Sequence, residues 1–131
     1  TAMSDPRNSL EALTDADLAS ASGGINMQLT QYGYPNDPDG DSDTRRGLGA
    51  YHNLQRGRSI ALTDSGLASL GLSHGQVRSG SHWVDIHLKG GGTLHREIDD
   101  RAPEGNRRVD MYQPGGFDKS LPGSADVTLS R

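Results

Sequence analysis

Two aspartates in the second half of the chain are the residues best placed for acid–base chemistry. Asp110 lies between Val109 and Met111, which are expected to face a core, so that Asp110 faces outward. Asp100 follows an expected strand and precedes a proline, which projects it from a rigid turn. Two carboxyl groups held close together raise the pKa of one of them, as a general acid near neutral pH requires. The alternative is structural: Asp100 caps its turn and Asp110 accepts bonds from backbone amides.

Aromatic side chains with polar groups beside them are surfaces that suit a sugar ring. The residues expected to bind a substrate in this way are Tyr32, Tyr34, Trp83 and Tyr112. Trp83 is the only tryptophan, and alternation puts it on the polar face of its strand with Asp85 and His87. The alternative for Trp83 is that it plugs the end of a barrel.

The densest acidic run offers hard oxygen ligands of the kind that calcium takes. Its carboxylates alternate along the chain at Asp37, Asp39, Asp41 and Asp43. The run is not an EF-hand, because Gly40 precedes the third aspartate and no glutamate closes the loop. The alternative is a surface loop of Asx turns that Arg45 and Arg46 neutralise. The sequence requires no cofactor, and calcium is the metal that this run suggests.

A glycine-rich hairpin offers a second set of metal ligands. A turn centred on Gly91 would place three cross-strand pairs on one sheet face: His87 with His95, Asp85 with Glu97, and Trp83 with Asp99. Two histidines and two carboxylates on one face could hold zinc. The alternative is an ordinary solvated face.

Composition limits the classes of protein that this chain can belong to. It has 131 residues, a formal charge of -4 and no cysteine, so a disulfide scaffold, a thiolate zinc site and a cysteine nucleophile are excluded. The acidic balance argues against nucleic acid as a partner, and no apolar run is long enough to span a membrane. The hydrophobic fraction of 31% with 18 glycines permits either partial disorder or a small, turn-rich β fold.

Six short alternating segments separated by glycines must position these side chains. They are residues 28–34, 59–63, 83–88, 93–99, 108–112 and 126–129, with a helical turn at 67–72. This pattern predicts an all-β barrel over residues 25–131.

Residues 1–24 differ from the rest of the chain. Leu10, Leu13 and Leu18 recur at helical spacing, and Gly23-Gly24 ends the pattern. The segment also resembles the double-glycine leader of peptides exported by peptidase-containing ABC transporters. That resemblance implies cleavage after Gly24 and a secreted or extracytoplasmic product.

Several short motifs follow one another in a distinctive order. They are Thr30-Gln31-Tyr32-Gly33, Ile60-Ala61-Leu62-Thr63-Asp64, Ile98-Asp99-Asp100-Arg101-Ala102-Pro103, Arg108-Val109-Asp110-Met111-Tyr112 and Gly116-Phe117-Asp118. They resemble the double-psi β-barrel superfamily, with the three-aspartate domain of membrane-bound lytic transglycosylase A, rare lipoprotein A and the barrel of expansins as the closest variants. The resemblance spans most of residues 28–118 and implies a six-stranded double-psi β-barrel.

The resemblance also implies a function. Asp110 stands where the family places its catalytic aspartate, with Asp100 as its partner, while Asp64 has the context of a structural turn residue. The expected protein is a monomeric, secreted lytic transglycosylase or glycoside hydrolase acting on cell-wall polysaccharide, above all peptidoglycan. A lytic transglycosylase needs only one acid/base, because a hydroxyl of the substrate is the nucleophile. The alternatives are an expansin-like module that binds polysaccharide or protein, and an exported toxin or inhibitor.

Overall fold

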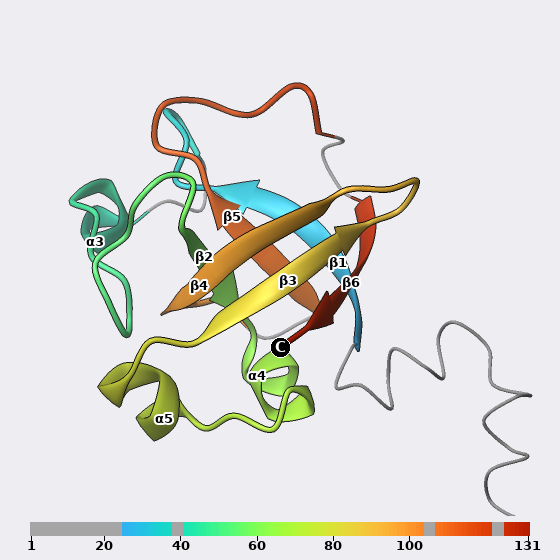
Figure 1. The fold of residues 1–131 in the computed structure, drawn as a ribbon. Coiled ribbons are helices and arrows are strands. Elements are labelled where there is room, and N and C mark those ends of the chain that lie inside the picture. The colour runs from blue at the N-terminus through green and yellow to red at the C-terminus, as the bar shows by residue number, and fades with distance from the viewer. Residues whose placement is uncertain (1–24, 38–40, 104–106, 122–124) are drawn as a thin grey trace, which may run out of the picture.

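Six strands close into a barrel in the computed structural model, which describes residues 25–37, 41–103, 107–121 and 125–131 (Figure 1). The strands are β1 (Ile25–Tyr32), β2 (Ser59–Leu62), β3 (Trp83–Leu88), β4 (Thr93–Arg101), β5 (Arg108–Tyr112) and β6 (Ala125–Ser130). The expected small all-β barrel is therefore confirmed. The expected N-terminal helix and leader, at 1–24, lie outside the described residues.

The strand order around the barrel is β1-β5-β2-β4-β3-β6. The pairs β1 with β5 and β2 with β4 are parallel, whereas the other four neighbouring pairs are antiparallel. β1 and β2 are not neighbours in the barrel, and neither are β2 and β3. The chain between the strands of each of these pairs therefore crosses the barrel, and it carries loops and short helices. These are α3 (Ser42–Arg45), α4 (Asp64–Ser69) and α5 (His74–Ser79). None of the described helices is long and apolar enough to cross a membrane.

The core fills the barrel interior and extends beneath it. Inward-facing side chains of the strands, such as Ile60, Ile98 and Leu129, are fully buried. α4 and α5 lie at one end of the barrel in Figure 1, and Leu67 and Val77 from these helices join the same core. A chain with few hydrophobic residues can therefore build one continuous core, because two short helices close the barrel.

Local capping explains where these two helices begin. The Thr63 side chain accepts a hydrogen bond from the Gly66 amide, so α4 starts at Asp64, earlier than the expected turn at 67–72. Ser73 and Gln76 form a capping box at α5. α5 was not expected from the sequence, although the Ser-x-x-Gln spacing is the signal that would have found it.

A β-bulge interrupts the pairing of β4 with β2. Ile60 is opposite Ile98, but the next residue, Ala61, is opposite Asp100, which leaves Asp99 as the extra residue. Ile98 is fully buried in the core, so the bulge allows the two consecutive aspartates to leave the core on the outer side of the barrel.

The loop between α3 and β2 covers this bulge. The Asp99 carbonyl accepts hydrogen bonds from the amides of Tyr51 and His52, at 3.0 and 3.1 Å. The Ala50 amide donates to Asp100 Oδ1 at 2.8 Å. A Cβ on Gly49 would lie only 2.4 Å from the Asp99 carbonyl oxygen, so the loop can approach the bulge this closely only with glycine there.

We predict that Gly49→Ala lowers the free energy of unfolding by about 1–3 kcal/mol, because the methyl group must push the loop off the bulge. Gly75→Ala is the matched control, since no heavy atom lies nearer than 4.0 Å to the added Cβ and the residue lies in α5. Chemical denaturation measures both. Equal stability of Gly49→Ala and the wild type would contradict the close approach.

Candidate functional site

Four residues form a row across the outer face of neighbouring strands. Thr30 of β1 is opposite Asp110 of β5, Asp110 is opposite Ala61 of β2, and Ala61 is opposite Asp100 of β4. Laterally paired residues of a sheet point to the same side. Asp100 and Asp110 therefore flank a small alanine, and the two aspartates predicted to act together are brought together.

A groove of about 690 Å³ runs over this row. Asp100 and Asp110 both line it, together with Tyr32, Tyr34, Arg101, Arg108 and Phe117. Asp37 and Asp41 of the acidic run line it as well. Four carboxyl groups, two arginines and aromatic rings in one depression form a surface with both charge and flat apolar faces.

The Asp100 carboxylate is held by three donors. Tyr32 donates its hydroxyl to Oδ2 at 2.9 Å, and the amides of Ala50 and Arg101 donate to Oδ1, each at 2.8 Å. Burial, and then the negative charge of Asp100, raise the pKa of Tyr32 well above its usual range. The Tyr32 hydroxyl therefore keeps its proton and acts as a donor to Asp100.

Asp110 faces outward as expected, but it lies at the floor of the groove with only 7% of its surface exposed. Arg108 Nε is 3.1 Å from its Oδ2. Val109 and Met111 on either side belong to the core, as the alternation predicted. Asp110 is therefore a largely enclosed carboxyl group with a guanidinium partner.

Tyr112, which was predicted to bind substrate, does not line the groove but does line a smaller hollow beside it. It is buried, its hydroxyl donates to the Thr44 carbonyl at 3.3 Å, and its ring packs at a tilt against Tyr32. Gly33 lets it approach the β1 turn, because a Cβ there would be 2.7 Å from the ring. Tyr112 supports Tyr32 from behind instead of lining the groove.

An aromatic pair stands at the edge of the groove. Tyr34 and Phe117 meet edge to face with ring centroids 5.4 Å apart, and Phe117 is 38% exposed. Tyr34 was predicted to belong to the site, whereas Phe117, which also lines the groove, was not. The signal for it was available: it is the only phenylalanine and it follows two glycines in a loop.

Trp83 lies away from the groove. It is on the exposed face of β3, as the alternation predicted, and its ring stacks on His95 at 4.9 Å with an interplanar angle of 13°. Its indole N–H donates to Ser81 Oγ at 2.8 Å. Trp83 is not among the residues that line the groove.

The hairpin between β3 and β4 has a different register from the one expected. Trp83 is opposite Glu97, Asp85 is opposite His95, and His87 is opposite Thr93. The turn is therefore centred on Gly90, and the expected pairing of the two histidines was wrong. Within the described residues no group of three or more His, Asp or Glu side chains is arranged to hold a metal ion.

The acidic run uses its described carboxylates for local structure. Asp37 accepts a hydrogen bond from the Gly33 amide, Asp41 caps α3 through the Thr44 amide, and Asp43 pairs with Arg46. Asp39 lies outside the described residues. These contacts fit the surface-loop alternative, and calcium binding stays a prediction.

Asp64 is a partner of Arg101 at the margin of the site. The guanidinium binds both carboxylate oxygens, at 2.8 and 2.5 Å, and His74 Nε2 is 3.3 Å from Oδ1. The Arg101 hydrogen bond lowers the pKa of Asp64. Asp64 is not a lining residue of the groove, which agrees with the structural role expected for it.

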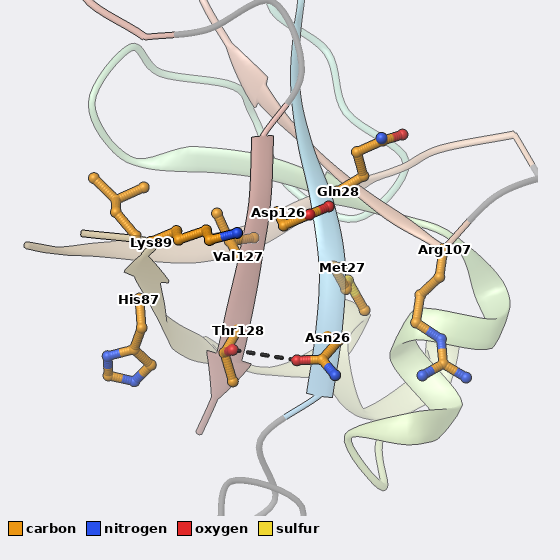
Figure 2. Close-up of a pocket in the computed structure, with 10 residues that line it drawn as sticks. Asn26, Met27, Gln28, His87, Lys89, Arg107, Asp126, Val127 and Thr128 are labelled. Atoms are coloured by element: carbon orange, nitrogen blue, oxygen red, sulfur yellow. Dashed lines mark hydrogen bonds between the residues drawn. The ribbon is translucent and has the colours of Figure 1, made fainter. Parts of the chain in front are cut away.

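A second hollow, of about 720 Å³, lies on the outer face of β1, β6 and β3 (Figure 2). His87, Lys89 and Arg107 surround it, and Thr128 donates to Asn26 across it. A single acidic side chain, Asp126, lines it. Paired carboxyl groups are therefore a property of the groove and not of this hollow.

Neither a protein-family model nor a curated protein matches this chain.

We predict that Tyr32→Phe lowers the free energy of unfolding by about 1.5–3 kcal/mol, because it removes a hydrogen bond to a charged group. Tyr34→Phe is the matched control: among the described residues its hydroxyl has no hydrogen-bond partner, so its effect should stay within about 0.5 kcal/mol. Thermal or urea unfolding measures the difference. If both variants lost the same stability, the Tyr32–Asp100 bond would not be a significant contact.

Proposed function

We propose that the groove binds cell-wall polysaccharide, in particular peptidoglycan glycan strands, and cleaves them in the manner of a lytic transglycosylase. The observation that carries this proposal is the row in which Asp100 and Asp110 flank Ala61 beneath an aromatic edge. A glycan needs both features: carboxyl groups for the bond that breaks, and flat rings for the sugars on either side.

In this proposal Asp110 is the acid/base. Its carboxyl group gives a proton to the glycosidic oxygen as the bond from the sugar carbon to that oxygen breaks. The carboxylate then accepts the proton of a hydroxyl on the same sugar, whose oxygen forms the new bond to the ring carbon. No water is consumed, and the protein ends in its starting protonation state.

Asp100 would assist without exchanging a proton. Tyr32 and two backbone amides already hold its carboxylate in place. A fixed negative charge in the groove favours the positive charge that develops on the sugar ring in the transition state. Tyr34 and Phe117 would bind neighbouring sugars through their ring faces.

The sequence resemblance to double-psi β-barrel proteins supports the same proposal. The two parallel strand pairs in an otherwise antiparallel barrel are compatible with that superfamily. We propose that the protein is a monomer and that it acts outside the cytoplasm. The leader-like segment at 1–24 supports the proposed location.

A second candidate is an expansin-like module that binds polysaccharide without cleaving it. One observation favours it: both oxygens of Asp100 already accept hydrogen bonds within the protein. A groove whose carboxylates are satisfied can recognise a glycan through its surface alone.

We predict that Asp110→Asn lowers the rate of glycan cleavage by about a hundredfold or more, because the amide cannot donate or accept the proton. Glycan binding should persist. Release of soluble fragments from purified peptidoglycan measures cleavage. Asp126→Asn is the matched control, since Asp126 is exposed on β6 and outside the groove. Full activity of Asp110→Asn would contradict the acid/base role, and a wild type that binds but never cleaves would select the binding module.

A further inference from the structure

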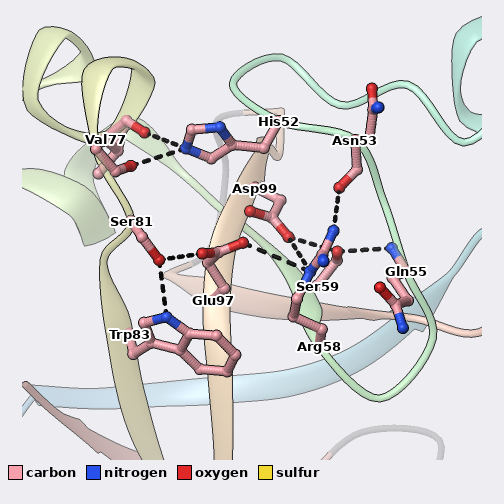
Figure 3. A network of polar contacts seen from close by, with 11 residues as sticks. His52, Asn53, Gln55, Arg58, Ser59, Val77, Ser81, Trp83, Glu97 and Asp99 are labelled. Carbon is pink, nitrogen blue, oxygen red and sulfur yellow. Dashed lines mark hydrogen bonds and ion pairs between the residues drawn. The ribbon is translucent and has the colours of Figure 1, made fainter.

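A buried pair of carboxyl groups lies next to the groove, under the loop that covers the β4 bulge (Figure 3). Glu97 and Asp99 belong to β4, two residues apart. Asp99 is fully buried and Glu97 nearly so. Neither residue lines the groove, so the proposed function does not use them.

The pair has one cationic partner and two hydroxyl donors. Arg58 Nε is 3.5 Å from both Glu97 Oε1 and Asp99 Oδ2. Ser59 donates to Asp99 Oδ2 at 2.5 Å, and Ser81 donates to Glu97 Oε2. One positive charge therefore faces two carboxyl groups in a site from which water is largely excluded.

Two buried atoms of this network lack a hydrogen bond among the described residues: Arg58 Nε, which makes only the two ion pairs, and the second oxygen of Asp99. Asp99 Oδ1 is buried and has no hydrogen-bond partner among the described residues. A charged oxygen left in this state is costly. If it carries a proton, it becomes a hydroxyl that can donate to the neighbouring Glu97 carboxylate. One proton on the pair also leaves a single negative charge, which matches the single charge of Arg58.

We propose that Glu97 and Asp99 share one proton while the covering loop is closed, and that loss of this proton releases the loop from the bulge. The proton goes to the solvent, and two buried negative charges then face one guanidinium. We call the Glu97–Asp99 pair and the covering loop a pH-sensitive latch. Any effect of the latch on glycan cleavage rests on the proposed function, whereas the latch itself does not.

The latch connects to the groove through both ends of the loop. At one end the Gln55 amide donates to Ser59 Oγ at 2.8 Å, and Arg58 donates to the Asn53 carbonyl at 2.9 Å. At the other end the Ala50 amide holds Asp100. Release of the loop would therefore remove one of the donors that fix Asp100 in the groove.

Apart from the pair itself, the titratable groups that face it belong to the loop. Besides Arg58, the loop contributes His52, whose Nε2 lies 2.6 Å from the Val77 carbonyl and 2.8 Å from the Gly80 carbonyl. Nε2 must therefore carry a hydrogen atom, because both neighbours are acceptors. β2 and the segment before β3 contribute only the neutral hydroxyls of Ser59 and Ser81.

The pKa shifts of the two carboxyl groups agree with one proton on the pair. Burial, followed by the hydrogen bond with Glu97, raises the pKa of Asp99 to about 7. Burial acts in the same direction on Glu97, but hydrogen bonds from Asp99 and Ser81 outweigh it and lower the pKa of Glu97. The proton therefore resides on Asp99.

The sign of the pH effect follows from these directions. The closed loop holds a proton that an open, solvated aspartate, with its usual pKa of about 4, would release. The closed state is therefore fully favoured below that value, and its advantage falls as pH rises toward the Asp99 pKa of about 7. Above that pH the free-energy advantage of the closed loop changes no further, because the aspartate is ionised in both states.

Hydrogen exchange of the Ala50, Tyr51 and His52 amides tests the latch. Their protection factors, corrected for the intrinsic pH dependence of exchange, should fall at least about tenfold between about pH 5 and about pH 8 in the wild type. Asp99→Asn carries a permanent hydrogen donor and no charge, so it should abolish the fall. Asp126→Asn, an exposed aspartate on β6, should keep it.

A wild type whose protection factors are equal at both pH values would overturn the latch. So would Asp99→Asn with an undiminished fall, because His52 or another group would then be the one that titrates. If Asp99→Asn does not fold, carboxyl ¹³C shifts of the wild type decide: one proton on the pair at about pH 6 supports the proposal, and two ionised carboxylates there contradict it. None of these readouts depends on glycan cleavage, so a failed latch and a failed enzyme are distinguishable.

Discussion

The β-bulge in β4 is the constraint on which the rest of the structure depends. In a regular strand Asp99 and Asp100 would point to opposite sides, and one of them would enter an apolar barrel interior. The extra residue places both outside the core. Asp100 then faces Asp110 across Ala61, while Asp99 lies under the covering loop with Glu97. The bulge thus gives two consecutive aspartates different surroundings: Asp100 lines the groove, and Asp99 is buried under the loop.

The covering loop converts this irregularity into a stable arrangement. Its amides satisfy the Asp99 carbonyl and the Asp100 carboxylate, and Gly49 permits the contact because a side chain would collide with the bulge. The same loop therefore contacts both the open groove, through Asp100, and the enclosed Glu97–Asp99 pair, through the Asp99 carbonyl. A change in the enclosed pair can therefore reach the groove without any direct contact between the two.

Local patterns in the sequence predicted the strands well, because alternation reports directly on which side chains are buried. β3 and β5 begin and end at the predicted residues, Trp83–Leu88 and Arg108–Tyr112. The short helices α3 and α5 were not predicted, since they have only four and six residues and begin at N-terminal caps. The hairpin register was wrong by two residues, because Gly90, Gly91 and Gly92 all adopt positive φ and any of them could have centred the turn.

The site depended on information that no local pattern contains. Asp100 and Asp110 were selected through a family resemblance, and their common row follows from the order β5-β2-β4, which the spacing along the chain does not specify. Nonlocal pairing also explains why two predicted site residues do not line the groove. Tyr112 is buried, and its hydroxyl donates to the Thr44 carbonyl of α3. Trp83 lies on a strand that is not a neighbour of β2 or β5.

The most direct test of the account is to locate a bound glycan by NMR. Soluble peptidoglycan glycan fragments are titrated into ¹⁵N-labelled protein, and backbone amide shifts are followed. The account predicts saturable shifts that cluster at Tyr34, Asp100, Asp110 and Phe117, around the groove. Shifts that cluster instead at Asn26 and Thr128, around the hollow of Figure 2, or no shifts at all, would contradict it.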